Sequence, residues 1–272
     1  MAPVRSTNWI WTPDWSREDE ATARLVYFRK RICLEPGSAP VRVKITADTR
    51  YKLYVNGVLR EVGPSKGDRS VWFVDELDLT DSLRVGENIL AVAVLRYPLE
   101  VGKGNHSLFR TKTPGLFIEG VGMDGWRCHV DRYTGFYREE ERFAPLIIHE
   151  YAAADPLAFG WKVAGFNDSA WETARPYADT ALPEVLRPEK LKERPIPFME
   201  RKLHRFVLPV RTIPAYTEEN FVLDAGEEMC AFPRLSFIGG AGAAVELLYA
   251  ECYVTEKGKK NRVDAERGYL EG

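Results

Sequence analysis

The stretch Thr46-Ala-Asp-Thr-Arg-Tyr-Lys-Leu-Tyr-Val-Asn-Gly57 decides the fold of this chain of 272 residues. Apolar side chains recur at every second position before and within it, at Val41, Val43, Ile45, Tyr51, Leu53 and Val55. This alternation predicts two strands that each bury one face. Asn56-Gly57 is a dipeptide typical of tight turns, so the second strand is expected to fold straight back. The pattern is that of a hairpin in an all-β sandwich.

Length and composition narrow the class of protein further. The chain is long enough for two domains of moderate size, each with its own core. Charged residues make up 29% of the chain and nearly cancel, at a net charge of −2. Aromatic residues reach 12%, a share that both β-sandwiches and sugar-binding surfaces favour. The charge balance favours neither nucleic acid nor an anionic membrane, so we expect neither as a partner.

The N-terminus and the cysteines bear on the compartment. Residues 1–10 lack the apolar core of a signal peptide, and no run approaches the roughly 20 apolar residues of a membrane span. The four cysteines lie far apart with no C-x-x-C spacing, at Cys33, Cys128, Cys230 and Cys252. This spacing predicts free, buried thiols rather than a zinc site or a disulfide framework. We therefore expect a cytoplasmic protein without a metal or cofactor.

Further strands follow from the same patterning, and we expect them at 23–34, 71–79, 88–95, 114–121 and 126–130. The last two look like a second hairpin with its turn at 123–125. Because 88–95 is apolar on both faces, it is expected at the centre of a sheet that is covered on both sides. Trp9, Trp11 and Trp15 could stack on sugar rings, but the favoured interpretation is that they pack under the sandwich.

Two polar segments in the middle of the chain have structural explanations. Asn167 and Asp168 precede a short helical turn, where their side chains can cap free backbone N–H groups. Trp171 is then expected in the core. The acidic run 139–141 is expected to be a solvated charge run rather than a catalytic cluster.

A proline-rich segment divides the chain. Six prolines stand among Glu, Lys and Arg between Thr180 and Pro214, a density that excludes long helices and central strands. We therefore predict an extended connector and two domains, 1–205 and 206–272. Strands are expected beyond it at 220–224, 232–238 and 244–250, with Gly239-Gly-Ala-Gly242 as a hairpin turn. Three strands do not close a sandwich, so the second β-sandwich is predicted to be incomplete.

Several pieces of the chain, taken in order, carry a family resemblance. They are Trp9-Ile10-Trp11, residues 47–57 with Gly63-Pro64, Asp75-Glu-Leu-Asp-Leu79 before Gly86-Glu-Asn88, Gly160-Trp161, Phe166-Asn-Asp-Ser-Ala-Trp171, Arg194-Pro-Ile-Pro197, Leu223-Asp-Ala-Gly226 and Tyr249-Ala-Glu251. This ordered set resembles the N-terminal part of bacterial α-L-rhamnosidases, the inverting glycoside hydrolases of family 78. The resemblance implies a galactose-binding-like β-sandwich (jelly roll) at the start of the chain.

The resemblance also bears on catalysis. In that family the catalytic carboxylates sit in an (α/α)₆ barrel that follows the β-domains, and this chain has no segment long and helical enough to form one. The resemblance therefore implies no catalytic residue in this chain. At Glu150-Tyr151 the chain also departs from the family, because Ala152-Ala-Ala-Asp155 stands where an Asp-Ala-Arg-like run is usual.

Three functions are compatible with these features. The first is a non-catalytic accessory part of an α-L-rhamnosidase-like hydrolase, which supports carbohydrate recognition beside a catalytic domain or a partner subunit. The second is a stand-alone carbohydrate-binding module. The third is a structural docking domain without a ligand, because an unfinished sandwich would expose an apolar face that self-associates or binds a partner.

If the chain binds a sugar, we expect the site at one rim of the first sandwich. Its candidate residues are Asp48, Arg50, Trp72, Arg96, Asn105 and His106, the last three in the polar loop 96–113. A charged pair beside an aromatic ring can hydrogen-bond sugar hydroxyls while the ring packs on the sugar. The favoured alternative for residues 48–50 is a tight turn with a surface ion pair, which contributes little to stability.

Overall fold

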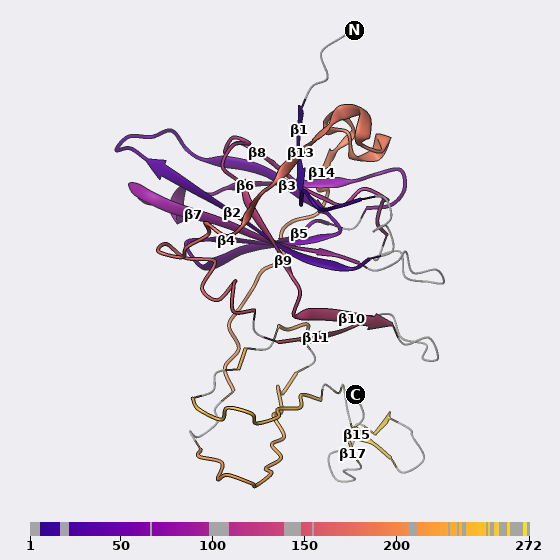
Figure 1. Ribbon diagram of the computed structural model, residues 1–272. Coiled ribbons are helices and arrows are strands. Elements are labelled where there is room, and N and C mark those ends of the chain that lie inside the picture. Colours follow the sequence, from indigo (N-terminus) through magenta and orange to yellow (C-terminus); the bar gives the residue numbers. More distant parts are fainter. Residues whose placement is uncertain are drawn as a thin grey trace. The chain divides into compact units, whose positions relative to one another are not determined.

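The computed structural model divides the chain into two compact units, Met1–Phe198 and Met199–Gly272 (Figure 1). It describes residues 6–16, 22–65, 67–97, 109–138, 148–153, 155–206, 211–227, 229–232, 234–235, 238–248, 250, 253–255, 260–261 and 269–270. The acidic run 139–141 and Cys252 lie outside these residues. No helix among them is long and apolar enough to cross a membrane.

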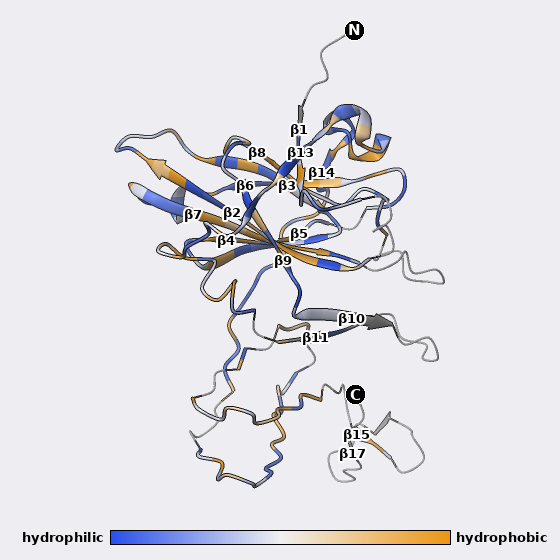
Figure 2. Ribbon diagram, in the orientation of Figure 1, coloured by the Kyte–Doolittle hydropathy of each residue, from blue (hydrophilic) through white to orange (hydrophobic). Residues whose placement is uncertain are grey.

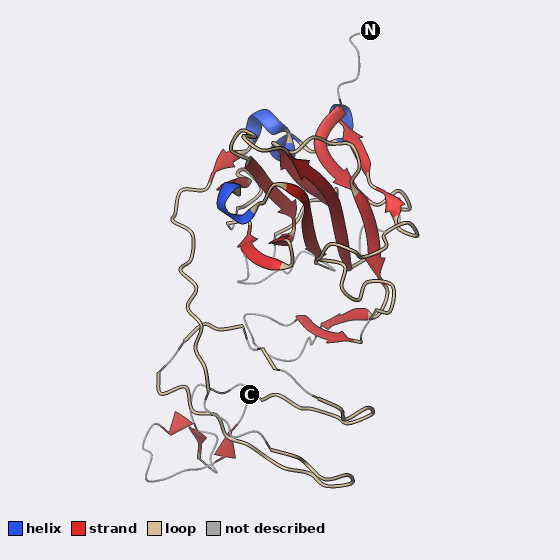
Figure 3. Ribbon diagram, turned by 90° about the vertical axis from the view of Figure 1, so that its left-hand side faces the viewer, coloured by secondary structure: helices blue, strands red, loops and turns tan. Residues whose placement is uncertain are grey.

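The first unit is a sandwich of two six-stranded sheets (Figures 1 and 3). The first sheet has the order β13 (Arg175–Ala178), β1 (Ser6–Trp11), β8 (Gly115–Glu119), β3 (Arg42–Asp48), β6 (Phe73–Asp78), β14 (Lys192–Glu193). The second has the order β12 (Glu172–Thr173), β9 (Arg127–Asp131), β2 (Arg24–Leu34), β7 (Gly86–Arg96), β4 (Arg50–Val55), β5 (Val58–Gly63). Neighbouring strands are antiparallel except β14, which runs parallel to β6. The predicted all-β sandwich is confirmed.

The stretch that decides the fold joins the two sheets. β3 ends at Asp48 in the first sheet and β4 begins at Arg50 in the second, so the chain crosses the sandwich within these residues. β4 then pairs with β5 across Asn56 and Gly57, whose φ angles of 50° and 85° suit a tight turn. The expected hairpin therefore consists of β4 and β5, and β3 packs across the core from it.

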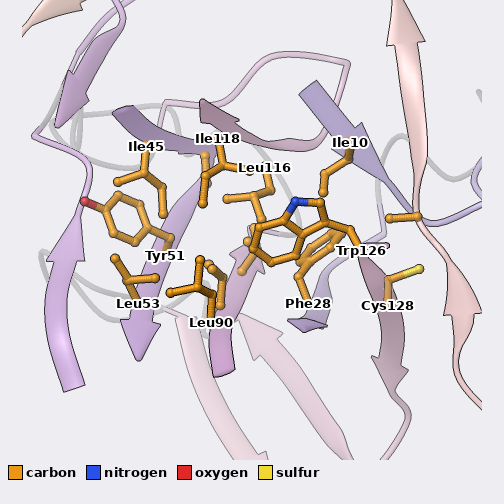
Figure 4. Packing of buried hydrophobic residues seen from close by; sticks show 14 of the residues in the cluster. Ile10, Phe28, Ile45, Tyr51, Leu53, Leu90, Leu116, Ile118, Trp126 and Cys128 are labelled. Atoms are coloured by element: carbon orange, nitrogen blue, oxygen red, sulfur yellow. The ribbon is translucent and has the colours of Figure 1, made fainter. Parts of the chain in front are cut away.

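The core lies between the two sheets, where side chains from both meet (Figure 4). Hydrophobic and hydrophilic residues alternate along the strands (Figure 2). β7 departs from this alternation because both of its faces are buried. Leu90, Val92 and Val94 point into the core, whereas Ile89 and Ala91 belong to a cluster on the outer face. β7 lies between β2 and β4, so the predicted central strand is confirmed.

Loops cover the outer face of each sheet. Ala158, Trp161 and Trp171 of the segment 155–171 pack on the outer face of the second sheet, against Ile89 and Ala91. Ser169 N donates to Asn167 Oδ1 (3.0 Å) in the turn before Trp171, which is 4% exposed. The predicted capped turn and the buried tryptophan are confirmed.

The proline-rich segment covers the first sheet. It forms the short 3₁₀ helices η4 (Asp179–Ala181), η5 (Glu184–Leu186) and η6 (Pro188–Lys190), and then edge strand β14. Leu182 and Leu186 pack on Trp9 and Phe117, and the Trp9 indole Nε1 donates to Leu186 O (2.7 Å). Trp9 and Trp11 are at most 1% exposed and Trp15 packs against the core, so the expected packing of the three tryptophans is confirmed.

Two predictions, one on the pairing of strands and one on the burial of the cysteines, are wrong. β8 and β9 do not form a hairpin, because β8 pairs with β1 and β3 in the first sheet whereas β9 pairs with β2 and β12 in the second. A turn signal cannot distinguish a hairpin from a crossing between sheets. The cysteines are free where described, as predicted, but only Cys128 is buried, since Cys33 and Cys230 are exposed.

The second unit has little regular structure in its described residues. The described residues of the segments 220–224, 232–238 and 244–250 do not form the expected strands. The described strands are β15 (Tyr253–Val254), β16 (Lys260–Asn261) and β17 (Tyr269–Leu270), which form a small sheet. Gly239–Gly242 does lie in a turn, closed by the bond from Ala243 N to Gly240 O (2.9 Å). An apolar segment forms a strand only where a partner strand supplies hydrogen bonds, which explains the difference.

Candidate functional site

Charged side chains gather where β3 and β7 end, at the end of the sandwich that the sequence singled out. Asp48 is the last residue of β3 and Arg96 the last residue of β7. Asp48 Oδ1 and Arg96 Nη1 are 3.5 Å apart, and both side chains are 0% exposed. Asp48 Oδ2 accepts hydrogen bonds from the backbone N (2.8 Å) and the hydroxyl (2.6 Å) of Thr111. The favoured alternative expected a surface ion pair within residues 48–50, but the structure buries Asp48 in a pair with Arg96.

Burial governs the chemistry of this pair. It raises the pKa of Asp48 to about 6, against the opposing effects of Arg96 and Thr111. Arg96 also donates to Thr111 O (3.2 Å), and its guanidinium lies 5.0 Å from the Trp15 ring centre. Each group thus bonds to neighbours in the protein, and the pair ties β3, β7 and the segment 109–113 together.

A second charged group lies on β4 and β6. Asp75 Oδ2 accepts a hydrogen bond from the Tyr51 hydroxyl (2.5 Å), and Asp75 Oδ1 lies 3.3 Å from Arg194 Nη1. Burial raises the pKa of Asp75, a shift that Tyr51 and Arg194 oppose. Since β4 belongs to one sheet and β6 to the other, this group links both sheets to the proline-rich segment that carries Arg194.

The remaining candidate residues are divided among different places. Arg50 is half-buried and donates to Pro64 O (2.7 Å). Trp72 is 4% exposed and packs in the cluster on the outer face of the first sheet, where its indole Nε1 donates to Thr46 Oγ1 (3.1 Å). Asn105 and His106 lie outside the described residues. The structure therefore brings Asp48 and Arg96 together, but it buries both of them and Trp72.

Sequence reasoning missed Thr111, Asp75 and Arg194. Thr111 lies 63 positions from its partner Asp48, and Asp75 lies 24 positions from Tyr51. Arg194 lies 119 positions from its partner Asp75. No local spacing signals such pairs. One indirect signal exists, because Asp75 and Arg194 both belong to the pieces that carry the family resemblance. No group of three or more metal-ligating side chains occurs among the described residues.

Another polar cluster lies on the outer face of the second sheet. Tyr27 donates from its hydroxyl to Asp131 Oδ2 (2.6 Å), and His129 Nε2 lies 2.6 Å from Asp155 Oδ2. The Tyr27 ring stacks on Trp161 at 4.6 Å between ring centres, and His129 stacks on Trp171 at 5.1 Å. These contacts hold the segment 155–171 on the sheet, and nothing in them requires a ligand.

Comparisons with known proteins indicate which family the chain resembles. No family model matches the chain. It is 26% identical over 239 residues to an α-L-rhamnosidase of Streptomyces avermitilis, which covers 77% of this chain. It also matches the solved structure of a family 78 rhamnosidase of Bacillus sp. GL1, with 27% identity over 72% of this chain and a TM-score of 0.54. The chain resembles the family 78 α-L-rhamnosidases.

The resemblance predicted from the sequence is therefore confirmed. The β-sandwich fold is confirmed as well, since this chain shares it with a rhamnosidase. The chain covers only 20% of the length of each of these two rhamnosidases. The activity of a whole rhamnosidase thus does not transfer to this chain by similarity.

Proposed function

We propose that this chain is a non-catalytic accessory part of an α-L-rhamnosidase-like glycoside hydrolase that supports carbohydrate recognition. The observation that carries the proposal is the match of the sandwich to a family 78 rhamnosidase over 72% of this chain but 20% of that enzyme. Carbohydrate as the ligand class comes from this similarity, and the high aromatic content of 12% is consistent with it. The galactose-binding-like jelly roll remains part of the proposal.

The chemistry of the buried acids supports a non-catalytic role. An inverting glycosidase needs one carboxyl group as acid and another as base, on the order of 6.5–9.5 Å apart with a water and the sugar between them. Asp48 and Asp75 are fully buried, and each faces an arginine inside the sandwich. Neither carboxyl group can reach a substrate at the surface.

Two measurements test the proposal together. The 272-residue chain should show no hydrolysis of 4-nitrophenyl α-L-rhamnopyranoside above the rate of the buffer, while calorimetric titration with rhamnosides should give heat of binding. A turnover that survives repurification would overturn the non-catalytic part. Absence of binding to any of a panel of rhamnose-containing oligosaccharides would overturn the carbohydrate part.

A second candidate, the structural docking domain, is favoured by one observation in the second unit. Many large apolar side chains there are well exposed, among them Leu203, Tyr216, Phe232 and Ile238. Surfaces of this kind bind a partner or self-associate. In this case the chain should form homo-oligomers or bind a catalytic domain or subunit, and show no affinity for sugars.

A further inference from the structure

The hairpin of β10 (Thr134–Arg138) and β11 (Ile148–Ala152) holds one aromatic ring flat and open to solvent. Gly135 lies directly opposite Tyr151 in this two-stranded sheet. A Cβ atom at Gly135 would overlap the Tyr151 ring, so the ring lies across the glycine backbone in the space a side chain would fill. The Tyr151 side chain is nevertheless 62% exposed. One face of the ring is thus supported by the partner strand, and its other face is left for water or a ligand.

The two faces of this hairpin differ. Side chains alternate along each strand, so Thr134 and Glu150 share the face opposite to that of Gly135 and Tyr151. The Thr134 hydroxyl donates to Asp131 Oδ2 (2.9 Å), and the same carboxylate oxygen accepts from the Tyr27 hydroxyl on β2 (2.6 Å). Thr134 is therefore tied to the second sheet of the sandwich, whereas Tyr151, on the opposite face of the hairpin, is exposed to solvent.

A second tyrosine borders the ring. Ala153 N donates to Tyr133 O (3.2 Å), which continues the pairing of the hairpin by one position. Tyr133 is therefore the diagonal neighbour of Tyr151 on the same face, at a spacing over which large side chains still interact. Its side chain is 45% exposed. The face thus offers two tyrosine rings separated by a glycine.

The turn that carries Tyr133 is fixed before any ligand arrives. Asp131 Oδ1 accepts hydrogen bonds from the backbone N of Tyr133 (2.7 Å) and of Thr134 (3.0 Å), and Asp131 is itself bound by the Tyr27 hydroxyl. Asp131 is 6% exposed. A platform of this kind loses little conformational freedom on binding, which favours affinity for a small rigid ligand.

We propose that Tyr151, with Tyr133 beside it, forms a stacking site for one pyranose ring of a carbohydrate. A flat aromatic face packs against the C–H face of a sugar, while the sugar hydroxyls and the tyrosine hydroxyls stay in water. Because Gly135 has no side chain, the Tyr151 ring can lie flat across the partner strand. A tyrosine that is merely exposed lacks this support. This inference rests on the proposed function, which supplies carbohydrate as the ligand class.

Substitutions at Tyr151 test the site with methyl α-L-rhamnopyranoside as the probe, and methyl β-D-galactopyranoside as a second sugar. Tyr151→Ala removes the ring and should weaken binding about tenfold in calorimetric titration. Tyr151→Phe keeps the ring and should bind as the unchanged chain does. Phe159→Ala is the matched control, because Phe159 is 85% exposed but lies on the segment 155–171.

The outcomes separate this inference from the proposed function. If the unchanged chain binds a sugar and Tyr151→Ala binds it equally well, the stacking site is overturned while carbohydrate recognition stands. Equal weakening by Phe159→Ala would also overturn it, since it would show general contact with exposed aromatic residues. If the unchanged chain binds no sugar at all, both the stacking site and the proposed carbohydrate recognition are overturned. Circular dichroism and thermal unfolding of each variant show whether the fold is retained. In Tyr133→Ala, NMR shifts of the Tyr151 ring protons on addition of the sugar report binding at the site, because this variant leaves the Tyr151 ring unchanged.

Discussion

Asp48 illustrates how a buried carboxyl group makes stability depend on pH. Its pKa rises from 3.8 to about 6 on folding because the carboxyl group is removed from water. Between these values the folded state binds more protons than the unfolded state, so this group's contribution to stability falls as the pH rises from 4 to 6. The loss approaches about 3 kcal/mol above pH 6. We therefore expect the unchanged chain to lose stability relative to Asp48→Asn over this interval.

Urea unfolding of both proteins at several pH values between 4 and 7 checks this prediction. The test is how the difference in unfolding free energy between Asp48→Asn and the unchanged chain varies with pH. The size of this difference at a single pH is not informative, because the amide also alters the bonds to Thr111 at every pH. Asp78→Asn serves as the control, since its carboxyl group is solvent-exposed and pairs with Arg42 at the surface. A difference between Asp48→Asn and the unchanged chain that stays constant with pH would show that Asp48 keeps an ordinary pKa in the folded state.

The sequence could indicate that residues 48–50 matter, but not how. Alternation predicts one strand through Val43 and Ile45 and another through Tyr51, Leu53 and Val55, and these residues do lie in β3 and β4. Whether Asp48 points to water or to Arg96 depends on a residue 48 positions later, at the end of another strand in the other sheet. Local patterns do not encode such a pairing, so the sequence favours a surface turn for the charged residues Asp48 and Arg50.

The segment 155–171 depends on one side chain of β2. Arg29 is 0% exposed and donates to Trp161 O (3.0 Å), to Val163 O (3.1 Å) and to Asp168. Arg29→Met keeps most of the volume but leaves Asp168 and two carbonyls without this donor. We expect a loss of about 3 kcal/mol in the free energy of unfolding. We also expect faster tryptic cleavage after Lys162 and a red shift of the tryptophan fluorescence as Trp161 and Trp171 loosen.

The matched control for this element lies on the same strand. Arg31→Met removes an arginine that is 52% exposed and pairs with Glu87, so its cost should stay below about 1 kcal/mol. Cleavage after Lys162 should remain slow in this variant. If the two variants lose equal stability, Arg29 is not the anchor of the segment.

At the level of elements, alternation predicts strands and faces but not partners. The two buried faces of β7 could be read from the sequence because each face is apolar by itself. The pairing of β8 and β9 could not, because a short turn connects strands of one sheet or of two sheets equally well. The same limit applies at residues 220–248, where apolar segments favour strands but no partner strand forms a ladder with them in the described residues.

The whole molecule divides into a unit with a core and a unit with exposed apolar residues. All members of the three buried clusters lie between Trp9 and Leu191, within the first unit. The buried apolar area that stabilises the sandwich therefore comes from that unit, and a chain ending at Phe198 should fold by itself. It should keep the cooperative thermal unfolding transition of the sandwich.

Comparison of three lengths of the chain tests this division. The full chain exposes Met199, Leu203, Tyr216, Ile238 and further large apolar residues, so it should bind an apolar dye and associate in light scattering. A chain ending at Leu248 retains these residues and should behave as the full chain does, whereas the chain ending at Phe198 should remain monomeric with severalfold weaker dye fluorescence. Equal dye binding by all three would place the exposed apolar surface on the sandwich itself. A shortened chain without a cooperative transition would mean that residues beyond Phe198 contribute to the stability of the sandwich.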